Sequence, residues 1–283
     1  VLVENGSFLG LFDWVPYHFR NGPWSIAAVA YICFFGYSCG LAGVYFLSDL
    51  SQPWFPLLSD DDESTSSFDS FSDHLMYSPL YSAQWYYHVF ACVWMIYIVY
   101  LLLVGPNGAK AWATYTVQSW TLLTFRHALC AMAPFDKTAL NLAELIRFPA
   151  ACSATITFCV WNFMLMPFIY FFGLKTAEAR SGFLKFATSF RLSNIHLLNI
   201  VLCSLNCGPW GSPRRRLEWI DFYGAFMSVM VYMAWYLFVL DRLGIHMYPI
   251  FSPRTGTVAV RLAWSALVLI YMGTFHMWRW FTD

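Results

Sequence analysis

The feature that most constrains this chain is the stretch Phe148–Phe172, which is 25 residues long and contains no charged side chain. A helix needs about 20 apolar residues to cross the hydrocarbon core of a bilayer. Pro149 suits the first turn of such a helix, and Pro167 is expected to kink it near its far end. The stretch therefore predicts a helix that spans a membrane.

Six further apolar runs are expected to form spans. Hydrophobic residues make up 59% of the chain and charged residues only 11%, against about a quarter charged in soluble domains. The prediction is an all-α polytopic membrane bundle of about seven transmembrane helices. Their expected bounds are Ser25–Phe46, Trp85–Val104, Val117–Ala133, Phe148–Phe172, Leu192–Leu205, Phe222–Leu240 and Val258–Trp278.

The fifth run, Leu192–Leu205, has only 14 residues, which form about 21 Å of helix. To span a bilayer, it is expected to recruit Phe183–Arg191 as well. The turn signal Gly105-Pro106-Asn107-Gly108 ends the second run. Alternation of the spans then places the segments Gly105–Tyr115 and Gly173–Thr188 on the same side of the membrane.

The predicted organisation has two parts. Residues 1–83 form an N-terminal segment with one transmembrane helix and an acidic, serine-rich loop, and residues 84–283 form a six-helix membrane bundle. The loop segment Ser59–Asp73 carries too few apolar residues to fold alone. We expect membrane lipids as partners, and protein partners through the acidic loop 59–73 and the first helix. A modest excess of Lys and Arg favours an N-terminus on the cytoplasmic or matrix side.

Several functional classes are disfavoured by the composition. The chain has 16 basic and 16 acidic residues, and its one triple basic run, Arg214–Arg216, gives no reason to expect a nucleic-acid partner. The eight cysteines form no C-x-x-C pair, so neither a metal centre nor disulfides are expected. A haem held by pairs of histidines is also disfavoured, because His88 and His276 lie at span ends and His246 lies in a loop. No cofactor is implied.

Polar residues inside two spans are the candidates for chemistry. The third span contains Thr124 and Arg126, and polar residues at membrane depth usually face a protein interior or a wet cavity. The alternative is that Arg126 reaches out to the interface and that Thr124 bonds its own helix. In the fifth span the spacing places a polar stripe on one helix face, formed by Ser193, His196, Asn199 and Cys203. Here the alternative is hydrogen bonding that only joins helices.

The depths of Thr124 and His196 are similar. If the spans alternate, the third and fifth enter from the same side, with Thr124 about 10 Å and His196 about 8 Å inside. A hydroxyl and an imidazole at one level are the minimum for nucleophilic catalysis, in which the histidine takes the proton of a poor nucleophile.

The chain resembles the androgen-induced (FAR-17a-like) family of membrane threonine hydrolases over about residues 115–283. The resemblance rests on the order and spacing of short motifs: Ser119-Trp120-Thr121-Leu122-Leu123-Thr124-Phe125, Leu145-x-x-Phe148-Pro149, His196, Trp235, and Gly244-x-x-x-Tyr248-Pro249. Members of that family cleave fatty acid esters of hydroxy fatty acids. The resemblance implies that Thr124 is the nucleophile and His196 the base.

Two functional hypotheses follow. The first is a lipid-ester hydrolase of the endomembrane system or plasma membrane, with catalytic Thr124 and His196, and with Ser193 and Asn199 binding the substrate. The second is a non-catalytic, lipid-binding subunit of a larger membrane complex, with the mitochondrial inner membrane as the alternative location.

Overall fold

The computed structural model describes residues 22–48, 79–105, 108–208, 216–243, 245 and 248–282. Within these ranges the chain is helical and contains no β-strand. The predicted all-α class is therefore confirmed. The acidic segment Ser59–Asp73 lies outside the described residues.

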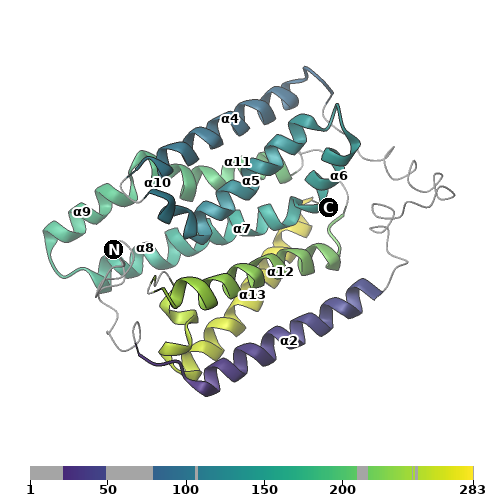
Figure 1. Ribbon diagram of the computed structural model, residues 1–283. Coiled ribbons are helices and arrows are strands. Elements are labelled where there is room, and N and C mark those ends of the chain that lie inside the picture. Colours follow the sequence, from purple (N-terminus) through teal and green to yellow (C-terminus); the bar gives the residue numbers. More distant parts are fainter. Residues whose placement is uncertain are drawn as a thin grey trace.

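The long helices lie roughly along a common direction in a bundle (Figure 1). They are α2 (Ile26–Ser48), α4 (Ala83–Leu103), α5 (Tyr115–Met132), α7 (Arg147–Cys159), α12 (Trp219–Trp235) and α13 (Thr257–Thr282). Short helices connect or extend them: α6 (Lys137–Leu145), α8 (Met166–Phe168), α9 (Ala177–Ala187), α10 (Phe190–Ser193) and α11 (Asn199–Cys207). In the described ranges, the π-helical segments are η4 (Val160–Leu165), η5 (Ile169–Gly173), η6 (Asn194–Leu198) and η7 (Tyr236–Asp241). The 3₁₀ turns there are η3 (Gly108–Ala113), η8 (Pro249–Phe251) and η9 (Pro253–Thr255).

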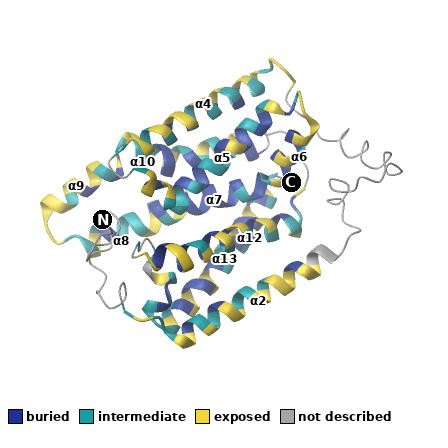
Figure 2. Cartoon of the chain, in the orientation of Figure 1, coloured by how far each residue is buried: buried dark blue, intermediate teal, exposed yellow. Residues whose placement is uncertain are grey.

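Helix α7 is the centre of the bundle and contacts α5, α11, α12 and α13. Its middle consists of small side chains, Ala150 to Ala154, and all five are buried. Small residues let neighbouring backbones approach closely, which is how membrane helices gain packing energy without a hydrophobic driving force. Figure 2 shows the burial concentrated on α7 and on the sides of α5, α12 and α13 that face it.

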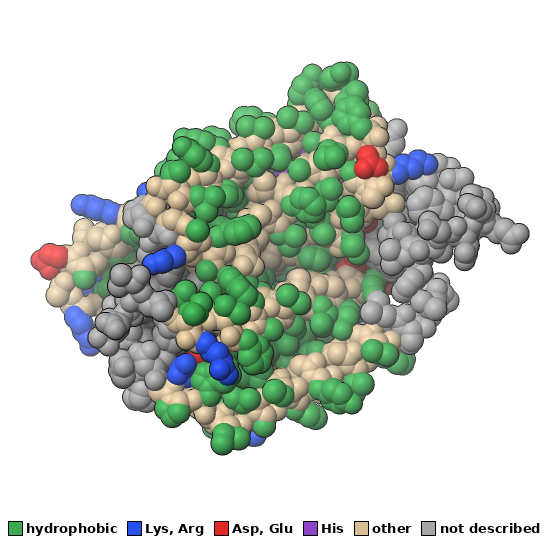
Figure 3. All heavy atoms as spheres, viewed as in Figure 1, with side chains coloured by type: hydrophobic (Ala, Val, Ile, Leu, Met, Phe, Trp, Pro, Cys, Tyr) green, Lys and Arg blue, Asp and Glu red, His purple; other side chains and the backbone are tan. Residues whose placement is uncertain are grey.

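Among the described residues, five helical stretches are long and apolar enough to cross a membrane: Ile26–Tyr45, Ala83–Leu103, Arg147–Gly173, Trp219–Asp241 and Thr257–Thr282. They agree with five of the seven predicted spans. The other two predicted spans are helical but do not meet the same length and hydropathy criteria, so the count of seven is not confirmed. On the face seen in Figure 3, charged side chains lie mostly at the two ends of the bundle and apolar ones fill the middle.

The fifth predicted span differs from the expectation. Residues 190–207 form one continuous helix through α10, η6 and α11, but Phe183–Arg191 does not simply extend it. The chain breaks at Thr188, whose hydroxyl donates to the carbonyl of Leu184 at 2.8 Å, and Ser189 is extended. The preceding residues instead form α9. Arg191 donates to the carbonyl of Leu101 at 3.2 Å, so the end of α4 and the start of α10 share one end of the bundle (Figure 1).

Helix α2 packs along α12 and α13. Phe35 packs edge-on against Trp264 at 5.3 Å between ring centroids, and the Tyr223 hydroxyl donates to the carbonyl of Cys39 at 3.1 Å. The backbone N–H of Ser25 donates to the carbonyl of Pro253 at 3.1 Å. Thus α2 is joined to the bundle along its length.

Candidate functional site

Thr124 lies in the middle of α5 and is buried. Its hydroxyl donates to the carbonyl of Trp120 at 2.8 Å, so the interpretation that it bonds its own helix is confirmed. The Trp120 indole in turn donates to the carbonyl of Met95 at 3.0 Å and ties α5 to α4. The threonine oxygen still has acceptor capacity, because its one proton is used and its lone pairs are not.

His196 lies on the π-helical segment η6 and is also buried. Its ring stacks on Trp161 of η4, with centroids 4.3 Å apart and an 11° angle between the rings. Its Nδ1 atom is buried without a hydrogen-bond partner. The Asn162 amide donates to the backbone carbonyl of His196 at 3.2 Å, which ties η4 to η6. Two π segments therefore meet at this histidine, and such segments occur frequently at functional sites.

The two residues predicted to bind substrate lie on the same helix as His196. Asn199 is fully buried and neither its amide oxygen nor its nitrogen has a hydrogen-bond partner. Ser193 is half-buried. Among the described residues no hydrogen bond joins Thr124 to His196. The catalytic pairing of these two side chains therefore stays a prediction.

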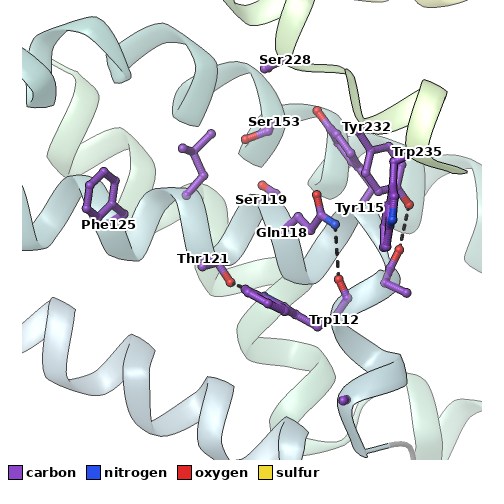
Figure 4. Close-up of a pocket in the computed structure, with 13 residues that line it drawn as sticks. Trp112, Tyr115, Gln118, Ser119, Thr121, Phe125, Ser153, Ser228, Tyr232 and Trp235 are labelled. Carbon is purple, nitrogen blue, oxygen red and sulfur yellow. Dashed lines mark hydrogen bonds between the residues drawn. The ribbon is translucent and has the colours of Figure 1, made fainter. Parts of the chain in front are cut away.

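A cavity of about 620 Å³ lies beside α5 (Figure 4). Three serines from three helices line it: Ser119 of α5, Ser153 of α7 and Ser228 of α12. The hydroxyls of Ser153 and Ser228 donate to carbonyls of their own helices, whereas the Ser119 hydroxyl is buried without a hydrogen-bond partner. The wall also contains Trp112, Tyr115, Thr121, Phe125, Tyr232 and Trp235. The cavity thus combines aromatic surface with a few hydroxyl groups.

A second cavity, of about 280 Å³, lies between α5, α7 with η4, α12 and α13. Its lining is predominantly aliphatic and aromatic. Tyr115 and Tyr232 border both cavities, so the two are neighbours. Thr124 and His196 line neither one. However, Phe125 lines the larger cavity and Trp161, the stacking partner of His196, lines the smaller one.

The tyrosines around the smaller cavity hold their hydroxyl groups in hydrogen bonds. The hydroxyls of Tyr115 and Tyr271 are 2.6 Å apart, and the Tyr248 hydroxyl accepts a bond from the backbone N–H of Tyr115 at 3.1 Å. The Tyr232 hydroxyl donates to the carbonyl of Ala113 at 3.0 Å. Burial raises the pKa of Tyr248, which lies in the loop after η7, to about 12, so this phenol is neutral at physiological pH.

A buried polar cluster that the sequence did not predict lies at the α6 end of the bundle. Arg126 is fully buried and does not reach the interface as the alternative interpretation expected; its Nη1 donates to the Cys130 sulfur at 3.2 Å. Buried Arg147 forms a salt bridge of 3.3 Å with buried Glu144. Two sequence signals could have predicted this cluster. One is the adjacent Arg126 and His127 within a span, and the other is the i, i+3 acid–base pair Glu144 and Arg147 at the entry to the next span.

Two histidines complete this cluster. His88 of α4 and His127 of α5 are both fully buried, with their Nδ1 atoms 3.2 Å apart. His88 lies near the start of α4, as the sequence suggested, and its side chain faces the interior of the bundle. In the part of the chain that the structure describes, no group of three or more His, Cys, Asp or Glu side chains has the arrangement of a metal site.

The chain matches no family model, no curated protein and no solved structure. The fold places the protein in the class of all-α bundles with several helices capable of spanning a membrane.

Proposed function

We propose that this membrane protein binds a lipid carrying a hydrogen-bonding group, in the slot between α5, α7, α12 and α13. The observation that carries this proposal is the apolar cavity of about 280 Å³. Four of its tyrosines use their hydroxyls in hydrogen bonds, so they offer ring surface to a ligand. Thr157 also lines the slot, and its hydroxyl is buried without a hydrogen-bond partner.

Affinity for an acyl chain alone would be small, because lipid tails are already as apolar as the side chains of the slot. Selectivity must come from shape and from a polar group placed within an apolar wall. Thr157 is the residue that offers such a group. We therefore expect a ligand whose ester, hydroxyl or carboxyl group bonds the Thr157 hydroxyl.

The test is labelling with a photoactivatable fatty acid in reconstituted vesicles, followed by peptide mapping. Ala266 lines the slot, so Ala266→Trp should fill it and reduce labelling of slot peptides several-fold. Leu269→Trp is the matched control, because Leu269 lies on the same helix and is 71% exposed. Equal labelling of both variants would contradict the proposal.

Ester hydrolysis is the second candidate. The specific observation in its favour is His196, which has an unpartnered Nδ1 and stacks on a tryptophan of the slot. In this proposal Thr124 is the nucleophile and His196 the base, and Ser193 and Asn199 hold the substrate. The Thr124 hydroxyl must then release the carbonyl of Trp120 and turn towards the imidazole.

Hydrolysis is tested with a fluorophosphonate probe and a fatty acid ester of a hydroxy fatty acid. Thr124→Val keeps the shape of the side chain and removes its hydroxyl. His196→Phe keeps an aromatic ring on Trp161 and removes both nitrogens. Each variant should lose labelling and turnover while keeping its unfolding midpoint. Turnover unchanged in Thr124→Val would exclude Thr124 as the nucleophile and leave lipid binding intact.

Membership of a larger membrane complex is compatible with lipid binding. The proposed contacts are the segment 59–73 and α2, which exposes Phe34 and Tyr37. A Cβ added at Gly36 or Gly40 of α2 would meet nothing within 4 Å, which leaves room for close approach of another helix. Deleting residues 59–73, or replacing both glycines by leucine, should shift the protein to a smaller species in native electrophoresis. Unchanged migration of both variants would remove this alternative.

A further inference from the structure

The His88–His127 pair has a property that lipid binding does not use. With the two Nδ1 atoms 3.2 Å apart, one must donate a proton and the other accept it when both rings are neutral. The two rings therefore hold opposite tautomers. It follows that one Nε2 atom is a bare acceptor and the other carries a proton. Both Nε2 atoms are buried without a hydrogen-bond partner.

A second, independent set of unpartnered polar atoms lies on the helix formed by residues 190–207. Asn206 Nδ2, both amide atoms of Asn199 and Nδ1 of His196 are all buried without hydrogen-bond partners. From Asn206 to His196 is ten residues, or about 15 Å along the helix. Buried polar atoms in native proteins nearly always have partners, and water supplies them where no protein group does.

Contacts connect the histidine pair to this helix. The Tyr87 ring packs on His127 with centroids 5.4 Å apart, and its hydroxyl donates to the carbonyl of Leu202 at 2.9 Å. Cys130, one turn after His127, lies 3.9 Å from the Asn206 amide oxygen. The pair and the polar face of the helix thus belong to one buried region between α4, α5 and α11.

We propose that the His88–His127 pair is a proton-relay site that binds water inside the bundle, with Asn206, Asn199 and His196 continuing the hydrated path. A proton from water binds the bare Nε2 of one ring. The Nδ1 proton of that ring crosses the 3.2 Å hydrogen bond to the second ring. The second ring releases its own Nε2 proton to the next water.

One proton enters and one leaves in each transfer, and the two rings exchange tautomers. The reverse transfer restores the starting arrangement, so the site exchanges protons in both directions. Neither ring keeps a charge after the transfer, which matters because a net charge is costly at membrane depth. Histidine chains are among the groups that serve as proton relays in membrane proteins.

Arg126 on α5 lies within electrostatic range of both histidines, and the Tyr87 ring on α4 packs on His127. Around Arg126 lie Cys130, Glu144 on α6, and Cys203 and Cys207 on α11. Arg147 on α7 lies within electrostatic range of Cys207. Helix α6, which carries Glu144, lies at one end of the bundle (Figure 1). His196 lies ten residues before Asn206 on the helix of residues 190–207. The relay therefore joins one end of the bundle to its interior.

The test is solid-state nuclear magnetic resonance of ¹⁵N-histidine protein in lipid vesicles. His88→Phe identifies the two signals of the pair among the seven histidines, and His276, which is exposed near the end of α13, is the control outside the pair. We expect magnetisation transfer from water to Nε2 of both rings, and exchange between opposite tautomers. The proposal would be overturned if neither ring received magnetisation from water, or if each ring held one fixed tautomer. The pair would then be a structural hydrogen bond without access to water.

His127→Asn separates the relay from a structural role. The asparagine side chain supplies a polar atom close to the Nδ1 position, so the bond to His88 and the unfolding midpoint should be retained. It has no counterpart of Nε2, so His88 should lose tautomer exchange. Exchange at His88 that persists in this variant would overturn the proposal, and the wild-type measurement decides the matter if the variant does not fold.

Discussion

Replacing Glu144 by glutamine is expected to be among the most destabilising single changes in the bundle. Glu144 and Arg147 are both buried, with 3.3 Å between their charged atoms. At an effective dielectric constant of about 20 the attraction at this distance is about 5 kcal/mol. The Arg126 guanidinium lies within electrostatic range of the same carboxylate. Glu144→Gln therefore leaves two buried guanidinium groups with less compensating charge.

Breaking a buried pair by removing one partner costs about 3–5 kcal/mol, and we expect a loss of this size in the free energy of unfolding. The assay is reversible unfolding in mixed micelles with an increasing fraction of sodium dodecyl sulfate. Glu178→Gln is the control, because Glu178 is exposed on α9 and should change stability by no more than about 0.5 kcal/mol.

The double variant Glu144→Leu/Arg147→Met provides the second control. Replacing a buried ion pair by apolar residues of similar volume is often neutral. Part of the lost stability should therefore return, although not all of it, because Arg126 keeps its charge. If Glu144→Gln were no more destabilising than Glu178→Gln, the carboxylate would be solvated and the description of a buried charge cluster would be wrong.

Three further predictions use the same unfolding assay. Asp241→Asn should cost about 3 kcal/mol, because buried Asp241 accepts bonds from the Trp24 indole at 2.9 Å and from Arg254 at 3.0 Å; a loss below 1 kcal/mol would contradict this. Thr155→Val should cost about 1–3 kcal/mol, since it leaves the buried Trp278 indole without the acceptor it now has at 2.8 Å; a neutral result would mean that the indole finds another acceptor. Gly256→Ala should cost about 1–3 kcal/mol, because Gly256 has φ 92° and ψ 161°, a region reserved for glycine. Gly273→Ala is the control, because Gly273 lies within α13 with open space around it and the change should stabilise by about 0.5–1 kcal/mol. Equal effects of the two substitutions would refute the backbone argument.

The helices that could be predicted from the sequence are those that coincide with long apolar runs. The run Phe148–Phe172 has only one interpretation, and the structure places a helical stretch there, Arg147–Gly173. Pro167 lies between two π-helical segments, η4 and η5, and the kink expected at this proline stays a prediction. In contrast, nothing in the hydropathy of Lys137–Leu145 predicted α6. That helix forms because Asp136 caps it, accepting the backbone N–H of Thr138 at 2.8 Å, and because its Ala139 and Ala143 pack on Leu129 and Cys130.

The candidate site was predictable only as a list of polar residues within spans. Thr124, His196 and Asn199 are all buried, as a polar face inside a bundle requires. Their neighbours depend on helix rotation and on the π segments, which spacing alone does not reveal. A π turn adds one residue per turn, so the stacking of His196 on Trp161 could not be derived from the i, i+3 and i+4 rule.

The two predicted spans that are too polar to count as membrane-crossing stretches both carry several buried polar side chains. Arg126, His127 and Thr124 lower the hydropathy of α5, and Asn199, His196 and Asn206 lower that of residues 190–207. These helices need not be apolar all round, because α4 and α7 cover much of α5, and α7 contacts α11. A helix shielded from lipid by its neighbours can hold hydrogen-bonding groups that a lipid-facing helix cannot. The low hydropathy that excludes them from a count of spans is therefore what one expects of helices that form an internal polar site.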